Sequence, residues 1–298
     1  RSVDFGVVTN VTQNHLEEHD DFAHYTDTKR KLLRLQRPQC ASVVNLDDPV
    51  SSHFVSDAPD RLLCFTTRGE EALAGHDGAF VRDGQICLRV DGRVFADLVA
   101  LDALRLPGPH NWQNVMAAIL VTGAFLGGPD KRSLGEARWA SLGRAAADFG
   151  GVPGRLEWVR DLADLDFYYD IEATTPEATM RAVEAFPGRP VVLIGGGHNK
   201  GLSYAEWGRC VAQHEASVCL LPGDATPLMV DALHAERVEP EMCADLEQAM
   251  SWALEQAPQE SVVILSPGAK GFYNDHIRGK SSFYRLAKRL RAAQRRVG

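Results

Sequence analysis

From about residue 155 onward, short apolar strands alternate with amphipathic helices, and this alternation constrains the fold more than any other feature. The expected strands are residues 155–160, 165–170, 190–195, 217–221 and 261–265. The expected helices are residues 176–186, 203–214, 226–235, 244–256 and 281–296. Strands joined through helices usually pair in parallel. The second half of the chain is therefore predicted to be a mostly parallel sheet with helices on both faces.

Three of these strands are followed by turns rich in glycine or polar residues, at 170–176, 195–201 and 266–272. The carboxyl ends of parallel strands meet at one edge of the sheet, where α/β proteins bind their ligands. Thr175 suits an N-cap and Pro176 the first helical position. The free N–H groups of such a helix favour an anion. A capped turn without a ligand explains any single case, but three turns on one edge predict a ligand crevice.

The first half of the chain is predicted to be a mixed α/β structure. Expected strands are residues 3–8, 41–45 and 61–66, and expected helices are residues 22–36, 110–125 and 133–148. Asp83-Gly84 and Asp91-Gly92 separate three further short strands, which predicts an antiparallel meander. A linker rich in glycine spans residues 149–154, so we expect two domains, 1–150 and 151–298.

Several polar residues of the first half are candidates for chemistry, although each has an ordinary structural explanation. His15 lies in a polar turn after the first strand, and in a helix it would share a face with His19. Lys29 lies in a charged helix, where a lysine is usually solvated. Asn111 and Asn114 would project from one side of a helix. Their amides could contact a nucleobase, but loop ties and caps are the commoner use.

Composition excludes some classes of protein. The formal net charge of -8 argues against a general nucleic-acid binder. No apolar run approaches the roughly 20 residues of a membrane span, and no signal peptide opens the chain. The six cysteines are scattered without a CxxC motif, which indicates reduced thiols of a cytoplasmic protein. Because the first residues already look like a buried strand, we expect the chain to begin inside a domain.

In their order and spacing, these segments resemble the Mur ligase family. The resemblance is carried by Tyr25, Lys29, Asn114 and residues 9–19, 45–48, 108–111, 151–157, 170–176, 195–201 and 266–269. It is greatest to the type that uses ATP to add glutamate to UDP-N-acetylmuramoyl-L-alanine through an acyl phosphate. The resemblance implies the C-terminal part of a central ATP-binding domain in residues 1–150, with a mixed sheet and helices. Residues 151–298 would form a Rossmann-like C-terminal domain that binds the amino acid.

The resemblance also implies roles for individual residues. His15 and Lys29 would be the catalytic and metal-binding residues, with His15 a ligand of Mg²⁺. Lys29 matches a lysine that the family carbamylates, which would convert its amine into an oxygen ligand suited to a hard cation. The phosphate-binding loop is expected upstream of Arg1. The residues implied to contact ATP are Asn111, Asn114, Arg155 and Asp170.

Thr174, Lys200 and Gly271 match positions near the incoming amino acid. Two departures leave the identity of that amino acid open. Glu172 would repel a glutamate side chain if it faced the pocket, and Gly271 stands where the type often has a serine. D-glutamate is the first expectation, and L-glutamate or another amino acid is the alternative.

Two other functions remain open at this point. A ligase outside cell-wall synthesis, such as a folylpolyglutamate or secondary-metabolite ligase, would share most of these residues. A fragment without the phosphate loop could instead bind ligands and catalyse nothing. The expected partners are small-molecule substrates, with no nucleic acid and no membrane, and the expected state is a monomer.

Overall fold

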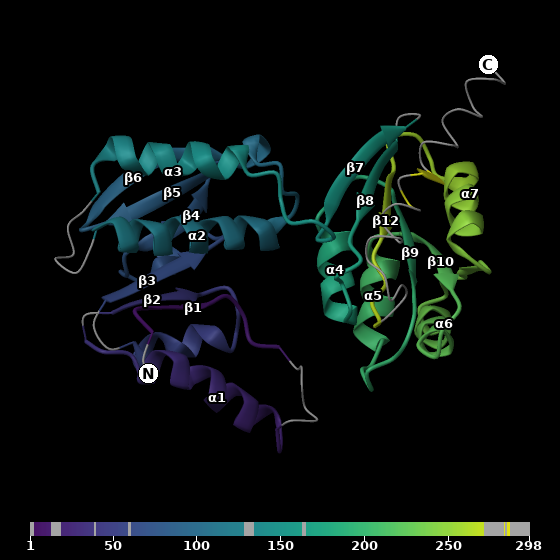
Figure 1. Cartoon of the computed structure of the whole chain (residues 1–298), viewed down its shortest axis with the longest axis horizontal. Helices are drawn as coiled ribbons and strands as arrows, with labels where there is room; N and C mark the ends of the chain where they lie inside the picture. Colours follow the sequence, from purple (N-terminus) through teal and green to yellow (C-terminus); the bar gives the residue numbers. More distant parts are fainter. Residues whose placement is uncertain are drawn as a thin grey trace. The chain divides into compact units, whose positions relative to one another are not determined.

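The computed structural model describes residues 3–12, 19–38, 40–58, 61–127, 134–162, 165–270, 283, 285 and 286. The chain divides into two compact units, Arg1–Gly150 and Gly151–Gly298. Each unit has its own six-stranded sheet and its own helices (Figure 1). The expected α/β class is therefore confirmed for both halves.

The sheet of the first unit is mixed, and its strands follow one another in chain order. They are β1 (Phe5–Val8), β2 (Ala41–Asn45), β3 (Arg61–Thr66), β4 (Gly78–Arg82), β5 (Gln85–Val90) and β6 (Arg93–Ala100). Strands β1 to β4 pair in parallel, whereas β4, β5 and β6 pair antiparallel. The predicted meander is confirmed, and Asp83-Gly84 and Asp91-Gly92 supply the positive φ angles of its two turns.

Three α-helices accompany this sheet in the described part of the first unit. They are α1 (Phe22–Arg34), α2 (Pro109–Gly127) and α3 (Glu136–Asp148), with short 3-10 turns η2 (Ser51–Asp57), η3 (Glu70–Leu73) and η4 (Leu101–Ala103). Helix α2 buries Val115, Met116 and Leu120 in the largest core cluster of this unit. Trp139 of α3 packs so closely on Gly123 of α2 that a Cβ there would lie 2.1 Å from the indole.

The sheet of the second unit is parallel except at one edge. Its strand order is β11 (Glu241–Met242), β10 (Ser217–Leu221), β9 (Val191–Gly196), β12 (Val262–Leu265), β8 (Leu165–Tyr169) and β7 (Glu157–Leu162). The predicted mostly parallel sheet is confirmed, with β7 as an antiparallel edge strand. The two-residue strand β11 was not expected from the sequence, because it is too short to show a pattern.

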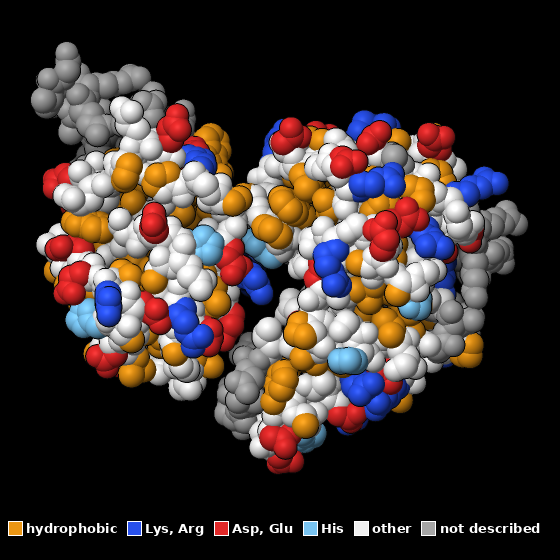
Figure 2. Space-filling view, turned by 180° about the vertical axis from the view of Figure 1, so that it is seen from behind, with side chains coloured by type: hydrophobic (Ala, Val, Ile, Leu, Met, Phe, Trp, Pro, Cys, Tyr) orange, Lys and Arg blue, Asp and Glu red, His pale blue; other side chains and the backbone are white. Residues whose placement is uncertain are grey.

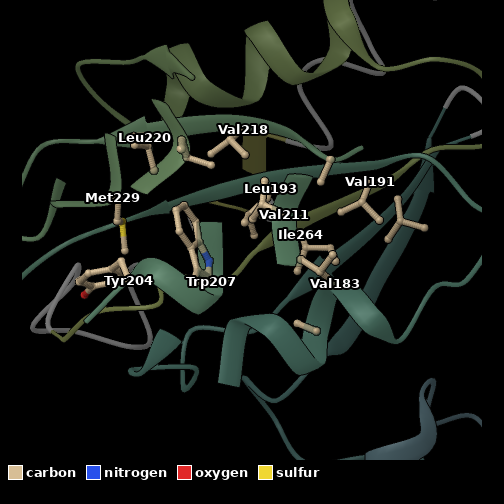
Figure 3. Close-up of a cluster of buried hydrophobic side chains, with 14 of the residues drawn as sticks. Val183, Val191, Leu193, Tyr204, Trp207, Val211, Val218, Leu220, Met229 and Ile264 are labelled. Carbon is tan, nitrogen blue, oxygen red and sulfur yellow. The ribbon is translucent and has the colours of Figure 1, made fainter. Parts of the chain in front are cut away.

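Helices cover both faces of this sheet. They are α4 (Pro176–Glu184), α5 (Ala205–Gln213), α6 (Thr226–Ala235) and α7 (Leu246–Gln256). Successive strand residues point to opposite faces, so Leu193 packs with α4, α5 and α6, whereas Val192 packs with α7. Figure 3 shows the first cluster, in which Trp207 of α5 is buried beside Leu193. Most of the helix expected at 281–296 lies outside the described residues.

Acidic and basic side chains are interspersed over the visible face of each unit in Figure 2. No helix within the described ranges combines the length and the apolar character needed to cross a bilayer.

Candidate functional site

The site in the second unit lies at the carboxyl edge of its sheet. Tyr169, Leu265 and Ile194 are register partners on β8, β12 and β9, so these three strands end side by side. The segments that follow them are therefore neighbours, although they are far apart in the sequence. The prediction that polar and glycine-rich turns share one edge is confirmed for the described residues.

Asp170 lies at the centre of a buried polar network. Its Oδ1 accepts a hydrogen bond from the N–H of Leu156 at 2.9 Å, and its Oδ2 accepts one from the hydroxyl of Ser266 at 2.8 Å. The Ser266 hydroxyl also lies 3.0 Å from the Thr179 hydroxyl. Asp170 is only 7% exposed. Burial, opposed by these hydrogen bonds and by the charge of Arg155, raises the pKa of Asp170 to about 7.

This network joins three segments of the second unit: the start of the unit at Leu156, the end of β8, and the turn after β12. Within the described residues, each carboxylate oxygen of Asp170 has one hydrogen-bond partner and keeps capacity for a second hydrogen bond. Asp170 is thus fixed in position and can still accept a bond from a ligand hydroxyl. Sequence reasoning did not single out Thr179, because nothing local marks a helical threonine as the partner of a distant serine.

Thr174 and Lys200 come together from two different strand ends. The ammonium of Lys200 donates to the hydroxyl of Thr174 at 3.0 Å. Directly afterwards, Thr175 caps α4 by accepting from the N–H of Ala178, with Pro176 at the first helical position, as predicted. The Lys200 ammonium and the N-terminus of α4 each favour an anion such as a carboxylate or a phosphate, and the first turn of α4 also carries the acidic Glu177.

The glycine-rich turn after β9 is held against the turn after β12 by backbone hydrogen bonds. Gly196 donates to the carbonyl of Pro267 at 3.0 Å, and His198 and Lys270 exchange bonds of 2.8 and 2.9 Å. Gly196 and Gly197 have φ angles of 118° and 124°, which other residues rarely adopt. The two turns therefore form one fixed surface.

The remaining candidates of the second unit are Arg155 and Gly271. Arg155 is exposed, and it directly precedes the residue whose N–H binds Asp170. This places Arg155 beside the polar network without burying its guanidinium. Gly271 lies outside the described residues.

In the first unit, Asn111 and Asn114 lie in the first turns of α2. Asn111 donates to the carbonyl of Pro107 at 2.7 Å, and Asn114 donates to Asn111 at 3.4 Å. Asn111 therefore connects the start of α2 to the preceding loop, which is the commoner use of such an amide expected from the sequence. The exposed Asn114 and the second lone pair of the Asn111 oxygen remain available to a ligand.

Asp47 is a second hydrogen-bonding centre, and sequence reasoning assigned it no role. It accepts bonds from the side chains of Thr66, Thr67, Arg68 and Gln113 and from the backbone of Thr67. Burial alone would raise the pKa of Asp47, but the bonds from Thr66, Thr67 and Gln113 outweigh it and lower the pKa. Because Gln113 lies on α2 between the two asparagines, Asp47 fixes the turn that presents them.

Lys29 is exposed on α1, with its ammonium 4.9 Å from the centre of the Tyr25 ring. His15 lies outside the described residues, so the pairing of His15 with Lys29 remains a prediction. Among the residues that the structure describes, no group of three or more His, Cys, Asp or Glu side chains could hold a metal ion. An unmodified Lys29 ammonium would repel a cation, so only a modified Lys29 fits a metal site.

Two family models match the chain. The Mur ligase middle domain matches residues 1–122, and the Mur ligase glutamate ligase domain matches residues 154–268. Each match falls within one of the two compact units.

Among curated relatives, the UDP-N-acetylmuramoylalanine–D-glutamate ligase of Symbiobacterium thermophilum is 34% identical over 274 residues, covering 91% of this chain and 57% of the relative. The enzyme of the same name from Geobacter metallireducens is 30% identical over 292 residues, covering 98% of this chain and 59% of the relative. The chain thus spans less than two thirds of the length of these relatives.

Solved structures share the fold at lower identity. The MurF ligase of Thermotoga maritima in complex with ADP has a TM-score of 0.64 at 18% identity, covering 97% of this chain and 63% of that one. A bifunctional folylpolyglutamate synthase/dihydrofolate synthase of Yersinia pestis has a TM-score of 0.60 at 16% identity, covering 98% and 61%. At such identities the likeness concerns the fold alone.

Proposed function

Because this chain belongs to the Mur ligase family, we propose that it is part of an ATP-dependent ligase that adds glutamate to UDP-N-acetylmuramoyl-L-alanine. Residues 1–150 would be the C-terminal part of the central ATP-binding domain, and residues 151–298 the amino-acid-binding domain. The names of the curated relatives support this substrate pair. In this proposal the phosphate-binding loop belongs to a part of the protein upstream of Arg1.

The observation that carries the proposal is the contact between Thr174 and Lys200 at the sheet edge. A hydroxyl and an ammonium beside the N-terminus of α4 would suit the carboxylate of an amino acid. The N-cap Thr175 keeps the helix N-terminus in place. Gly271 would complete this subsite, as its position in the family pattern suggests.

For the nucleotide, Asp170 and Arg155 are the candidates in the second unit. Asp170 is held by Leu156 and Ser266 and keeps acceptor capacity for a ribose hydroxyl. The exposed guanidinium of Arg155 suits a phosphate. On α2, Asn111 and Asn114 are the candidates for the adenine edge.

The catalytic centre would combine His15 and a carbamylated Lys29 around Mg²⁺. Carbamylation would replace the Lys29 ammonium by oxygens, which is the ligand chemistry that Mg²⁺ prefers. When bound, the metal would offset the negative charge that develops on the transferring phosphoryl group.

The reaction would proceed in two steps at this site. The carboxylate of the sugar peptide would attack the γ-phosphorus of ATP and form an acyl phosphate, with release of ADP. The amine of glutamate would then attack the acyl carbon, and phosphate would leave. Holding the two substrates in line is the main contribution expected of the protein. We further propose that the enzyme is cytoplasmic, because ATP is the energy source, and we keep the expectation from the sequence that it is a monomer.

D-glutamate is the proposed amino acid because it is the one in the names of the relatives. The specific reason to test others is Glu172, a partly buried carboxylate two residues before Thr174. If Glu172 faced the amino-acid side chain, it would disfavour glutamate.

Phosphate release from ATP by the full-length protein tests the proposal. We expect release only when both UDP-N-acetylmuramoyl-L-alanine and D-glutamate are present. L-glutamate, lysine and a folate substrate are the comparison substrates. Lys200→Ala and Thr174→Ala should raise the KM for D-glutamate by about tenfold or more, since each removes a charged or polar partner of its carboxylate. Release that is independent of the sugar peptide and of the amino acid would refute the assignment.

A further inference from the structure

The turn after β10, residues 222–226, has no role in the proposed site, yet it packs directly against the turn that carries Lys200. Strand β10 pairs with β9, and Leu221 is the register partner of Gly196. The turn after β10 and the turn after β9 therefore leave the sheet side by side.

Gly223 makes the closest approach between the two turns. A Cβ on Gly223 would lie 2.1 Å from the carbonyl oxygen of Gly197, a backbone atom that no rotamer change can move away. The same carbonyl oxygen of Gly197 also accepts a hydrogen bond from the N–H of Ala225 at 2.9 Å, which holds the two turns together. Only glycine at position 223 is compatible with this packing.

Asp224 holds the segment immediately before Lys200. Its Oδ1 accepts a hydrogen bond from the N–H of Asn199 at 2.7 Å and lies 3.5 Å from the Nδ1 of His198. The side chain of Asn199 in turn accepts from the N–H of Leu202 at 3.1 Å. Asp224 and Asn199 thus fix the backbone on both sides of Lys200.

The turn after β10 is itself well anchored. The hydroxyl of Thr226 donates to the carbonyl of Leu221 at 2.6 Å, and the N–H of Thr226 donates to the carbonyl of Gly223 at 3.2 Å. Ala225 is fully buried. Because the turn after β10 is itself held in place, its contacts can also hold the neighbouring turn that carries Lys200.

We propose that Gly223 and Asp224 are positioning residues that hold the Lys200 turn and thereby set the affinity of the site for the carboxylate of the amino-acid substrate. This inference rests on the proposed function for the identity of the ligand. The two residues would act through Lys200, whose ammonium lies 3.0 Å from the Thr174 hydroxyl. Both side chains can bind the same substrate carboxylate only if the Lys200 turn keeps this distance.

Hydrogen exchange of the Asn199 amide in the 298-residue chain tests the mechanical part. In Asp224→Ala the amide loses its acceptor and should exchange about tenfold faster, whereas Asp224→Asn keeps an acceptor oxygen and should stay close to the wild type. Asp231→Ala removes an exposed carboxylate from α6 and serves as the matched control. Equal exchange in Asp224→Ala and Asp231→Ala would overturn the positioning role.

Steady-state kinetics of the full-length ligase test the functional part. Asp224→Ala and Gly223→Ala should raise the KM for glutamate about threefold to tenfold, with kcat and the KM for ATP changed less than about twofold. Asp224→Asn should restore the wild-type KM. Faster exchange without a rise in KM would overturn the link to the substrate. A wild-type protein without ligation would refute the proposed function, and the exchange data would still decide whether Asp224 holds the turn.

Discussion

Asp170→Asn should change how the stability of the chain depends on pH. Burial raises the pKa of Asp170 to about 7 in the folded state, against an ordinary value of 3.8. Between these two values the folded state holds a proton on Asp170 that the unfolded state has released. The free energy of unfolding therefore falls as pH rises through this window and levels off above pH 7.

The size of the effect follows from the two pKa values. At about 1.4 kcal/mol per pH unit, the contribution of Asp170 falls by about 3 kcal/mol between pH 5 and pH 8. Asparagine keeps an acceptor oxygen for the N–H of Leu156, and its amide can donate to the hydroxyl of Ser266. Because asparagine does not titrate, Asp170→Asn should gain about 3 kcal/mol relative to the wild type over this range.

Urea unfolding at pH 5, 6, 7 and 8, followed by circular dichroism and tryptophan fluorescence, measures this difference. In the difference between wild type and Asp170→Asn, the contributions of the other titrating groups to the pH dependence of stability cancel. Asp231→Asn controls for the loss of one acidic charge. A stability difference that stays constant from pH 5 to pH 8 would show that Asp170 is ionised in both states and that burial does not raise its pKa into this range.

Three further predictions concern single positions. Gly123→Val should destabilise the first unit by about 1–3 kcal/mol, because the new side chain meets Trp139, and thermal unfolding should show the loss. Asp47→Ala should cost about 2–4 kcal/mol at pH 7, because its partly buried donors lose their acceptor. Since the folded state lowers the pKa of Asp47, that difference should shrink in urea unfolding as pH falls below about 4. Thr175→Ala should cost about 1 kcal/mol in the same assay through loss of the N-cap of α4.

Local patterns in the sequence were sufficient for most of the fold. Strand β10 and helix α6 have the expected bounds, because an apolar strand and an amphipathic helix show their periods within a few residues. The N-cap at Thr175 and the proline after it were also predictable, since capping depends on neighbouring residues. The shared edge of the three turns followed from the parallel order of their strands.

The tertiary structure alone decided which side chains meet at that edge. Asp170 finds its partners at Leu156, 14 residues away, and at Ser266, 96 residues away, and no periodic pattern encodes such a pairing. The same holds for Asp224 and Asn199, which are 25 residues apart. Hydrogen-bond partners across a sheet edge depend on strand order and register, which result from the packing of the whole unit, whereas helices, strands and caps depend on short-range sequence.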